Sequence, residues 1–308
     1  GGFRRPGTGG VAVIPGPLAG TLLAGSWLAW TAAIEPRWLW VRTYWLRPGA
    51  GPRPDPPVAE GAAGPPPVRL PEESPVAGRR AVRIAHLTDL HAPLYRIDES
   101  RLLEALHAWE PHLVAFTGDL AEGGGLPYDA GLRLLARLAA RWPVYFVPGN
   151  HDHLAGWPPM DQRLREAGVR VLVNEGESVT VGGLPLFIAG VDDPHTGRDR
   201  LDEALAGAPP AAPVLLLAHA PSQRLRRLAA ERRIPLVLVG HTHGGQVRLP
   251  GLGALWVPGQ GWFPRYDRGW FRLGDGYLLV NAGLGTPKPW IRWLCPPEIV
   301  LIEWEPGG

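Results

Sequence analysis

Short apolar runs recur along the chain from residue 80 onward, and segments with helical periodicity lie between them. The runs are rich in valine, isoleucine and leucine and are too short for helices, which predicts buried strands. The predicted strands are 82–87, 113–116, 144–147, 169–173, 184–189, 214–218, 236–239, 277–280 and 299–302. Amphipathic helices are predicted at 98–109, 132–138, 161–167 and 221–230, the first with Asp98 as its N-cap. Such alternation is typical of a layered α/β core, in which helices cover buried sheets.

An uncharged stretch at 11–34 precedes this core. At about 1.5 Å per residue it is long enough to cross a hydrocarbon layer of roughly 30 Å, so we expect a transmembrane helix. A cleaved signal peptide and a buried hydrophobic helix are the alternatives. More arginines follow the stretch than precede it, which favours a cytoplasmic catalytic domain. The expected location is therefore the inner membrane, with single-pass or peripheral attachment.

Changes in residue composition along the chain predict three parts. Residues 38–46 mix aromatic and β-branched side chains and predict a strand. The segment 48–79 is rich in proline, glycine and alanine and predicts an extended linker. The predicted division is a membrane anchor and strand at 1–47, a linker at 48–79 and a catalytic domain at 80–308.

Composition narrows the kinds of ligand. The chain has 308 residues and a formal net charge of +2, so it gives no electrostatic case for nucleic acid, and no nucleic-acid partner is expected. Its single cysteine, Cys295, excludes an internal disulfide and a metal site built from cysteines. Any metal must therefore bind to oxygen and imidazole groups.

Polar residues of that kind follow five of the predicted strands. Each set stands directly after an apolar run, and the carboxyl ends of strands are where open α/β sheets form sites. The sets are Thr88-Asp89-Leu90-His91, Thr117-Gly118-Asp119, Pro148-Gly149-Asn150-His151-Asp152, His219, and Gly240-His241-Thr242-His243. Their combination predicts a metal site, although each set alone could be a polar turn.

These ordered motifs resemble those of the calcineurin-like metallophosphoesterases. Further segments, including Gly283-Leu284-Gly285-Thr286 and Cys295-Pro296-Pro297-Glu298, are similar to the membrane-associated YkuE-type and YaeI-type subgroup and to a UDP-2,3-diacylglucosamine hydrolase of chlamydial type. The resemblance implies a four-layer α/β/β/α sandwich, here with an N-terminal membrane helix. It also implies a metal-dependent phosphoric ester hydrolase.

The resemblance assigns the ligands of two divalent metal ions, with Mn expected and Fe or Zn as alternatives. One ion would be held by Asp89, His91, Asp119 and His243. The second would be held by Asp119, Asn150, His219 and His241, so that Asp119 bridges the two. Such a pair of metals can stabilise the attacking and leaving oxygens of a displacement at phosphorus.

Two catalytic residues are also implied. His151 is expected to protonate the leaving oxygen or to stabilise charge on the phosphoryl group. Some relatives orient this histidine with an acid three residues after the bridging aspartate, which here predicts a Glu122–His151 pair. Asp152 is the alternative partner for His151, unless it caps the following turn.

The expected substrate is a phosphodiester or pyrophosphate, in a membrane lipid or a nucleotide-linked lipid such as UDP-2,3-diacylglucosamine. The segment from Gly118 to Gly124 lacks the arginine found in protein serine/threonine phosphatases. An aromatic-rich insertion at 252–272 is expected to form either a lipid-facing lip or a small core beneath a loop. The alternatives are an enzyme acting on cell-wall phosphate polymers and a non-catalytic membrane scaffold; the oligomeric state stays open.

Overall fold

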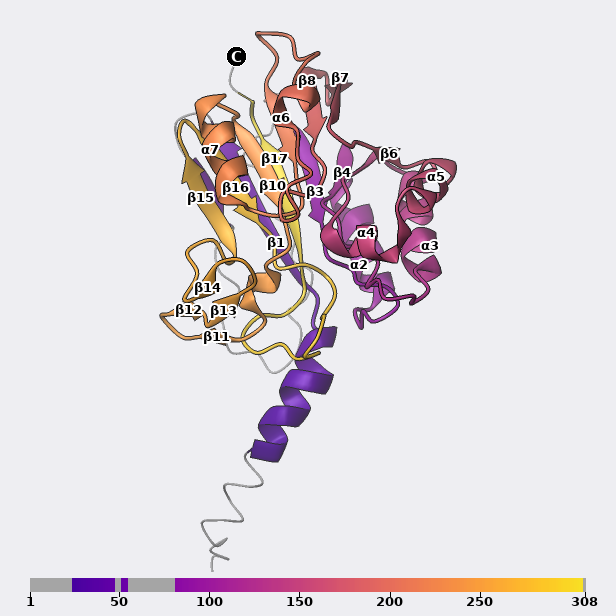
Figure 1. Ribbon diagram of the computed structural model, residues 1–308, viewed down its shortest axis with the longest axis vertical. Helices are drawn as coiled ribbons and strands as arrows, with labels where there is room; N and C mark the ends of the chain where they lie inside the picture. Colours follow the sequence, from indigo (N-terminus) through magenta and orange to yellow (C-terminus); the bar gives the residue numbers. More distant parts are fainter. Residues whose placement is uncertain (1–23, 48–50, 55–80, 307–308) are drawn as a thin grey trace, which may run out of the picture.

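Two β-sheets stacked face to face form the centre of the computed structural model (Figure 1), which describes residues 24–47, 51–54 and 81–306. The order of the larger sheet is β2 (Gly51–Pro54), β1 (Trp40–Arg47), β17 (Glu298–Trp304), β3 (Val82–Leu87), β4 (Leu113–Phe116), β5 (Val144–Phe146) and β6 (Arg170–Val171). The order of the smaller sheet is β15 (Gly269–Leu273), β16 (Gly276–Val280), β10 (Leu236–Val239), β9 (Val214–Leu217), β8 (Leu184–Gly190) and β7 (Glu175–Val181).

The central strands of each sheet run parallel. Strands β3 to β6 are parallel in the larger sheet, as are β8, β9, β10 and β16 in the smaller one. Parallel neighbours place their carboxyl ends at one edge of a sheet. The polar residues that follow β3, β4, β5, β9 and β10 are therefore brought towards one another.

Both faces of the central strands are buried, which explains their continuous apolar sequences. In β3, Val82 and Ile84 belong to the core between the two sheets, whereas Ala85 and Leu87 belong to the core beneath the helices. Successive side chains of a strand point to opposite faces, so one short run supplies two cores.

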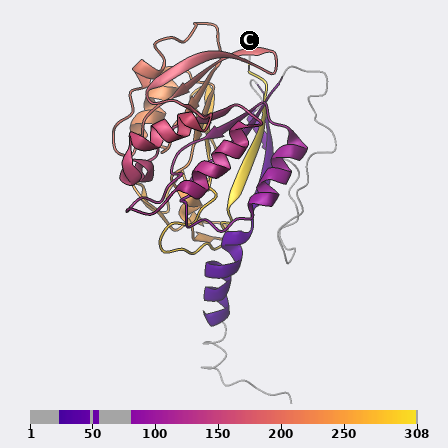
Figure 2. The ribbon, with the colours of Figure 1, turned by 90° about the vertical axis from the view of Figure 1, so that its right-hand side faces the viewer.

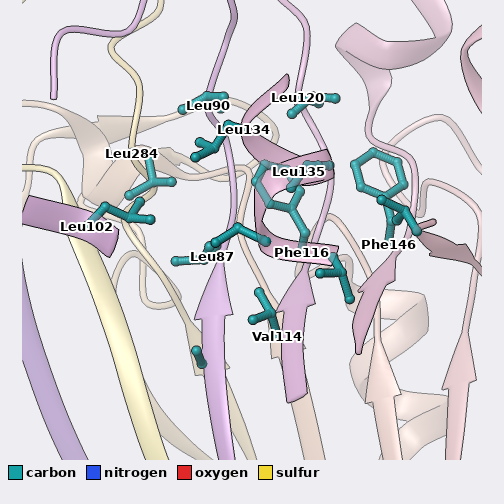
Figure 3. Close-up of a cluster of buried hydrophobic side chains, with 14 of the residues drawn as sticks. Leu87, Leu90, Leu102, Val114, Phe116, Leu120, Leu134, Leu135, Phe146 and Leu284 are labelled. Atoms are coloured by element: carbon teal, nitrogen blue, oxygen red, sulfur yellow. The ribbon is translucent and has the colours of Figure 1, made fainter. Parts of the chain in front are cut away.

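Helices cover the outer face of each sheet. The larger sheet packs against α2 (Glu99–Trp109), α3 (Asp129–Ala139) and α5 (Pro159–Glu166), which lie in front of it in Figure 2. Figure 3 shows Leu102, Leu134 and Leu135 near the strand residues of this core. The smaller sheet packs against α6 (Leu201–Ala204) and α7 (Gln223–Glu231). The predicted α/β/β/α layers are thus confirmed for the described residues.

The predicted helix starts are explained by their caps. Asp98 accepts a hydrogen bond from the backbone N–H of Ser100, and Ser222 accepts one from Leu225. Unpredicted elements are α4 (Asn150–Gly156), α6, β2, β7 and β15, together with the short pairs β11 (Arg248–Leu249) with β12 (Gly253–Ala254) and β13 (Trp256–Val257) with β14 (Gly261–Trp262). Strand β7 is polar and lies at a sheet edge, so it lacks the apolar signal on which the prediction relied.

Strand β1 lies before the predicted boundary at residue 80 and belongs to the larger sheet. Strand β1 pairs in parallel with β17, from Trp40 with Glu298 to Leu46 with Trp304. Strand β2, inside the predicted linker, pairs antiparallel with β1. The rest of the predicted linker, 48–50 and 55–79, lies outside the described residues.

The predicted membrane location is not supported. Residues 11–23 of the proposed membrane helix lie outside the described residues, and residues 24–37 form a short helical segment ending in Glu35–Arg37. Among the described residues, no helix has both the length and the apolar character needed to span a bilayer. We therefore withdraw the expectation of an inner-membrane protein with a cytoplasmic catalytic domain.

The buried side chain of His86, on strand β3, should make the stability of the protein depend on pH. It is fully buried, and one ring nitrogen lies 2.8 Å from the hydroxyl of Thr117. Burial lowers the pKa of His86 from 6.5 to about 3. The folded state therefore keeps the ring neutral. Above pH 6.5 the ring is neutral in the unfolded state as well, and burying it carries no protonation cost. As the pH falls from 6.5 towards 3, only the unfolded state gains the proton, so the free energy of unfolding decreases.

We expect acid to destabilise the wild-type protein more than the variant His86→Gln. Between about pH 7 and pH 5 the wild type should lose about 2 kcal/mol more free energy of unfolding, because its unfolded state gains a proton that the folded state rejects. Urea unfolding of both proteins at each pH, in the presence of a chelator, would measure the two changes in the free energy of unfolding. Equal losses in the two proteins would contradict the assignment.

Candidate metal centre

Several of the predicted ligands have an unusual backbone conformation. The φ angles are 52° at Asp89, 53° at His91, 53° at Asp119, 70° at His241 and 50° at His243. The left-handed region costs a non-glycine residue roughly 1–2 kcal/mol, and such residues gather at functional sites. The surrounding packing holds these side chains in directions that an ordinary turn would not give them.

Glycines make the crowding at these loops possible. A Cβ atom on Gly149 would lie 2.2 Å from Oδ1 of Asp119, and one on Gly240 would lie 2.1 Å from Oδ2 of Asp89. Neither contact is sterically allowed, so any side chain at these positions would displace a predicted ligand.

One cluster joins the loop after β3 to the loop after β10. Nε2 of His243 lies 3.1 Å from Nε2 of His91 and 3.4 Å from Oδ1 of Asp89. The distance from Nε2 of His91 to Oδ1 of Asp89 is 3.9 Å. All three residues are buried, and we call this cluster site A.

A second cluster joins the loops after β4, β9 and β10. Nε2 of His219 lies 3.2 Å from Oδ2 of Asp119 and 3.2 Å from Nδ1 of His241. These three residues are also buried, and we call this cluster site B.

Asp119 links the two sites. Its Oδ2 atom lies 3.2 Å from Nε2 of His219 in site B and 3.7 Å from Nε2 of His91 in site A. Its Oδ1 atom accepts a hydrogen bond from the backbone N–H of His151 at 2.8 Å. This is the position that a bridging carboxylate requires.

The donor atoms fit divalent metal ions. Metal–ligand distances of about 2.0–2.2 Å place neighbouring ligand atoms about 3–4 Å apart, as they are in both clusters. Asn150, which begins α4, has a buried Oδ1 atom without a hydrogen-bond partner among the described residues. Its neighbour Gly149 lies against Asp119 and His219. Asn150 can therefore add an oxygen to site B; the division of ligands between two ions stays a prediction.

The pKa values of the clustered histidines shift in two directions: burial would lower those of His91 and His219, but neighbouring carboxylates raise both, whereas those of His241 and His243 fall. Burial and the charge of His219 hold the pKa of His241 well below its usual value, and burial and His91 do the same for His243. Burial alone would raise the pKa of Asp119, but the charge of His219 lowers it instead. Neutral imidazoles and an ionised carboxylate are the forms that coordinate metals.

Contacts behind the ligands fix which ring nitrogen faces the centre. Nδ1 of His219 donates to the backbone carbonyl of Thr117 at 2.8 Å, which leaves Nε2 as the coordinating atom. Nδ1 of His91 lies 2.8 Å from Oε2 of Glu122, which leaves Nε2 towards His243. The neighbouring carboxylates raise the pKa of His91 against the effect of burial, so a metal ion that binds at its Nε2 atom must displace a proton.

The predicted pair of Glu122 and His151 differs from the observed contacts. The carboxylate of Glu122 lies on His91, whereas Nδ1 of His151 lies 2.5 Å from the backbone carbonyl of Glu122; the three side chains still form one candidate metal-binding group. The physical reason is the loop conformation, since Glu122 hydrogen-bonds through its backbone N–H to Ala92, beside His91. His151 itself stacks edge-on against His91, with ring centroids 4.8 Å apart.

Asp152 does not orient His151. Its side chain is fully buried and accepts hydrogen bonds from the backbone N–H groups of Asp119, Ala121 and Gly149 at 2.8, 3.0 and 3.0 Å. Asp152 thus caps the start of α4 and also ties the loop after β4 to the loop after β5.

The variant Glu122→Gln should weaken metal binding at site A. A carboxylate behind a ligating histidine typically contributes about 10–100-fold to metal affinity. We expect a loss of that size on titration of the metal-free protein with Mn²⁺, because His91 loses its charged partner. Glu203→Gln, at an exposed helical position, is the control. Unchanged metal affinity with lower turnover would instead favour a direct action on His151.

Arg292 belongs to the surroundings of site A but was not predicted. It is fully buried and donates to the carbonyls of Ala282 and Cys295 at 2.9 Å each, as well as to Gly283 and Gly285. The backbone N–H of Gly285 donates in turn to the carbonyl of Asp89 at 2.6 Å. A proline- and tryptophan-rich neighbourhood gives no pattern from which a buried arginine could be inferred.

Comparison with known proteins places this geometry in a family. The family profile described as calcineurin-like phosphoesterase matches residues 82–245, from β3 through the last predicted ligand. An uncharacterized metallophosphoesterase of Aquifex aeolicus is 34% identical over 237 residues, which cover 74% of this chain and 86% of that protein. YkuE of Bacillus subtilis, an uncharacterized metallophosphoesterase, is 30% identical over 70% of this chain and 72% of its own length. Phosphodiesterase YaeI of Escherichia coli is 28% identical, over 72% and 81%. This chain therefore belongs to the calcineurin-like phosphoesterase family and is a metal-dependent phosphoester hydrolase.

Proposed function

We propose that the protein hydrolyses a phosphodiester or pyrophosphate bond at a two-metal centre. The observation that supports this most directly is the position of Asp119, whose Oδ2 atom lies within 3.7 Å of a ligand from each site. Divalent ions, when bound there, supply Lewis-acid chemistry that activates water and neutralises phosphoryl oxygens. We propose Mn as the resident metal, with Fe or Zn as alternatives.

His151 is the residue placed to act on the substrate. Its Nδ1 atom donates to the carbonyl of Glu122, so Nε2 is the nitrogen left to exchange a proton with a leaving oxygen. Its backbone N–H holds Asp119, and its ring rests on His91. These contacts with Asp119 and His91 support the proposal that His151 acts on the leaving oxygen.

The surface beside site B supports a lipid-linked substrate. The ring of His195 lies tilted at 38° against that of His241, with centroids 4.4 Å apart, and a Cβ on Gly259 would lie 3.7 Å from the ring of His195. The insertion that carries Gly259 exposes Trp256, Trp262 and Phe263, which are 48%, 72% and 58% accessible. An aromatic surface that reaches a phosphoesterase centre suits a molecule with an apolar part.

The remaining aromatic residues of the insertion have a different role. Trp270 packs against the inter-sheet core, and Tyr266 and Phe271 pack against the core beneath α7. The two expectations for 252–272 therefore apply to different parts of it, and only the exposed part is available to a substrate.

Hydrolysis of bis-p-nitrophenyl phosphate by the Mn-loaded protein tests the reaction. We expect turnover that a chelator abolishes and added Mn²⁺ restores. A protein that binds no metal and hydrolyses nothing with Mn²⁺ would refute the proposal.

A panel of UDP-2,3-diacylglucosamine, phospholipids, cyclic nucleotides and cell-wall phosphate polymers tests the substrate class. The double variant Trp256→Ala and Trp262→Ala should lose activity on the lipid-linked substrates only and keep its activity on bis-p-nitrophenyl phosphate. Turnover of the wall polymers alone would favour the alternative substrate.

A further inference from the structure

The N-terminal helical segment (residues 24–37) is joined to the metal centre by buried contacts. Figure 1 shows it meeting the domain at one end. Thr31 is fully buried and Glu35 is 3% exposed. A buried carboxylate is costly unless its oxygens find partners, so the contacts of Glu35 need an explanation.

Both oxygens of Glu35 are engaged. Oε1 accepts a hydrogen bond of 2.6 Å from the backbone N–H of Cys295, and Oε2 accepts one of 3.2 Å from the indole of Trp30. The carboxylate thus connects the N-terminal helical segment to a loop about 260 residues away in sequence. Hydrogen bonds to an ionised carboxylate are among the stronger ones in proteins.

Cys295 carries the connection to a predicted metal ligand. Its thiol is buried and donates to the backbone carbonyl of His243 at 3.2 Å. A Cβ atom on the next residue, Gly244, would lie only 2.5 Å from this sulfur, so the thiol sits tightly against the turn that carries His243. His243 has a φ of 50°, a conformation that its surroundings must maintain.

A second connection reaches Asp89. The carbonyl of Thr31 accepts a hydrogen bond of 2.9 Å from the backbone N–H of Arg292. The Arg292 side chain holds the carbonyl of Gly285, and the backbone N–H of Gly285 donates to the carbonyl of Asp89. Both connections therefore end on ligands of site A.

Two of the three clustered residues of site B are held from elsewhere, whereas His241 shares the turn of His243 and donates its backbone N–H to Asp89 of site A. His219 is fixed by the carbonyl of Thr117, and Asp119 is fixed by Asp152 and His151. These residues belong to the loops after β4 and β5, not to the loop around Cys295. We propose that Glu35 is a positioning residue for site A, acting through Cys295 on His243, so that the N-terminal helical segment is a structural part of one half of the metal centre. This inference rests on the proposed two-metal centre.

Metal titration in single-site backgrounds tests the proposal. His241→Ala removes a ligand of site B and leaves site A to be measured, whereas His243→Ala leaves site B. Adding Glu35→Ala should weaken Mn²⁺ binding about 10–100-fold in the first background, the range for groups that orient metal ligands. In the second background Mn²⁺ affinity should change less than twofold.

Variants of Cys295 separate positioning from loss of folding. Cys295→Ala should weaken site A, and Cys295→Ser should restore part of the affinity because a hydroxyl can also donate to the carbonyl of His243. Glu231→Ala, an exposed glutamate on α7, is the matched control. Equal weakening of the two sites, or unchanged affinity at site A in the Glu35 and Cys295 variants, would overturn the proposal. If neither single-site background binds Mn²⁺, the proposed two-metal centre itself fails.

Discussion

The variant Asp119→Asn is expected to lose turnover of bis-p-nitrophenyl phosphate by about 10³-fold or more, because several kcal/mol of metal-derived stabilisation disappear. The amide oxygen can still accept the hydrogen bond from the backbone N–H of His151, which fixes the side chain in its present direction. The NH₂ group then replaces Oδ2, the atom nearest to His91 and His219. An amide nitrogen donates hydrogen bonds and does not coordinate a divalent cation.

The metal content of the variant Asp119→Asn provides a second, independent measurement. We expect the content of both metals to fall, since the lost atom faces both sites. Asp202→Asn is the matched control, because Asp202 is highly exposed and pairs only with Arg232 on the surface. Selective loss of one metal, with the second at its wild-type level, would show that Asp119 serves a single site.

The clustering of the predicted metal ligands followed from the sequence, because local pattern placed each of them just after a buried strand; their assignment to metal ions came from the family resemblance and stays a prediction. The parallel strands are buried on both faces, so their apolar runs were unmistakable, and the ligands stand within a few residues of their ends. For example, the run 236–239 is followed at once by Gly240 and His241. Parallel order then brings those strand ends together without further information.

The partners of these ligands did not follow from the sequence because they depend on contacts between distant segments. Glu122 was expected on His151 because some relatives orient this histidine with an acid at that position, yet the carboxylate lies on His91. Glu35 and Cys295 are 260 positions apart and come into contact only in the folded protein. No periodicity encodes such a contact.

The N-terminal stretch shows how hydrophobicity alone can mislead. An uncharged run at 11–34 satisfied the length and composition of a membrane helix. From residue 24 onward the chain instead forms a short helical segment whose Thr31 and Glu35 are buried on the domain. The apolar side chains of Trp27, Leu28 and Ile34 in this segment are 38%, 54% and 41% exposed, so its apolar pattern does not identify the residues that contact the domain.

The variant Asp152→Asn should destabilise the protein strongly. Both carboxylate oxygens of Asp152 receive backbone N–H groups, and the side chain is fully buried. The asparagine NH₂ group would face at least one of these donors, leaving it without an acceptor in the interior. With loss of charge-assisted bonds, we expect a decrease of about 3–5 kcal/mol in the free energy of unfolding.

The same change should reach the metal centre, because one of the three donors is the backbone N–H of Asp119. Urea unfolding of the metal-free protein measures the stability term, and Mn²⁺ titration of the folded variant measures the displacement of Asp119. Asp161→Asn is the control, since Asp161 lies near the surface of α5 and pairs with Arg165 four residues away. If Asp152→Asn is as stable as this control, the three backbone contacts contribute little. If stability falls but metal affinity is kept, the position of Asp119 is secured by His151 and His219 alone.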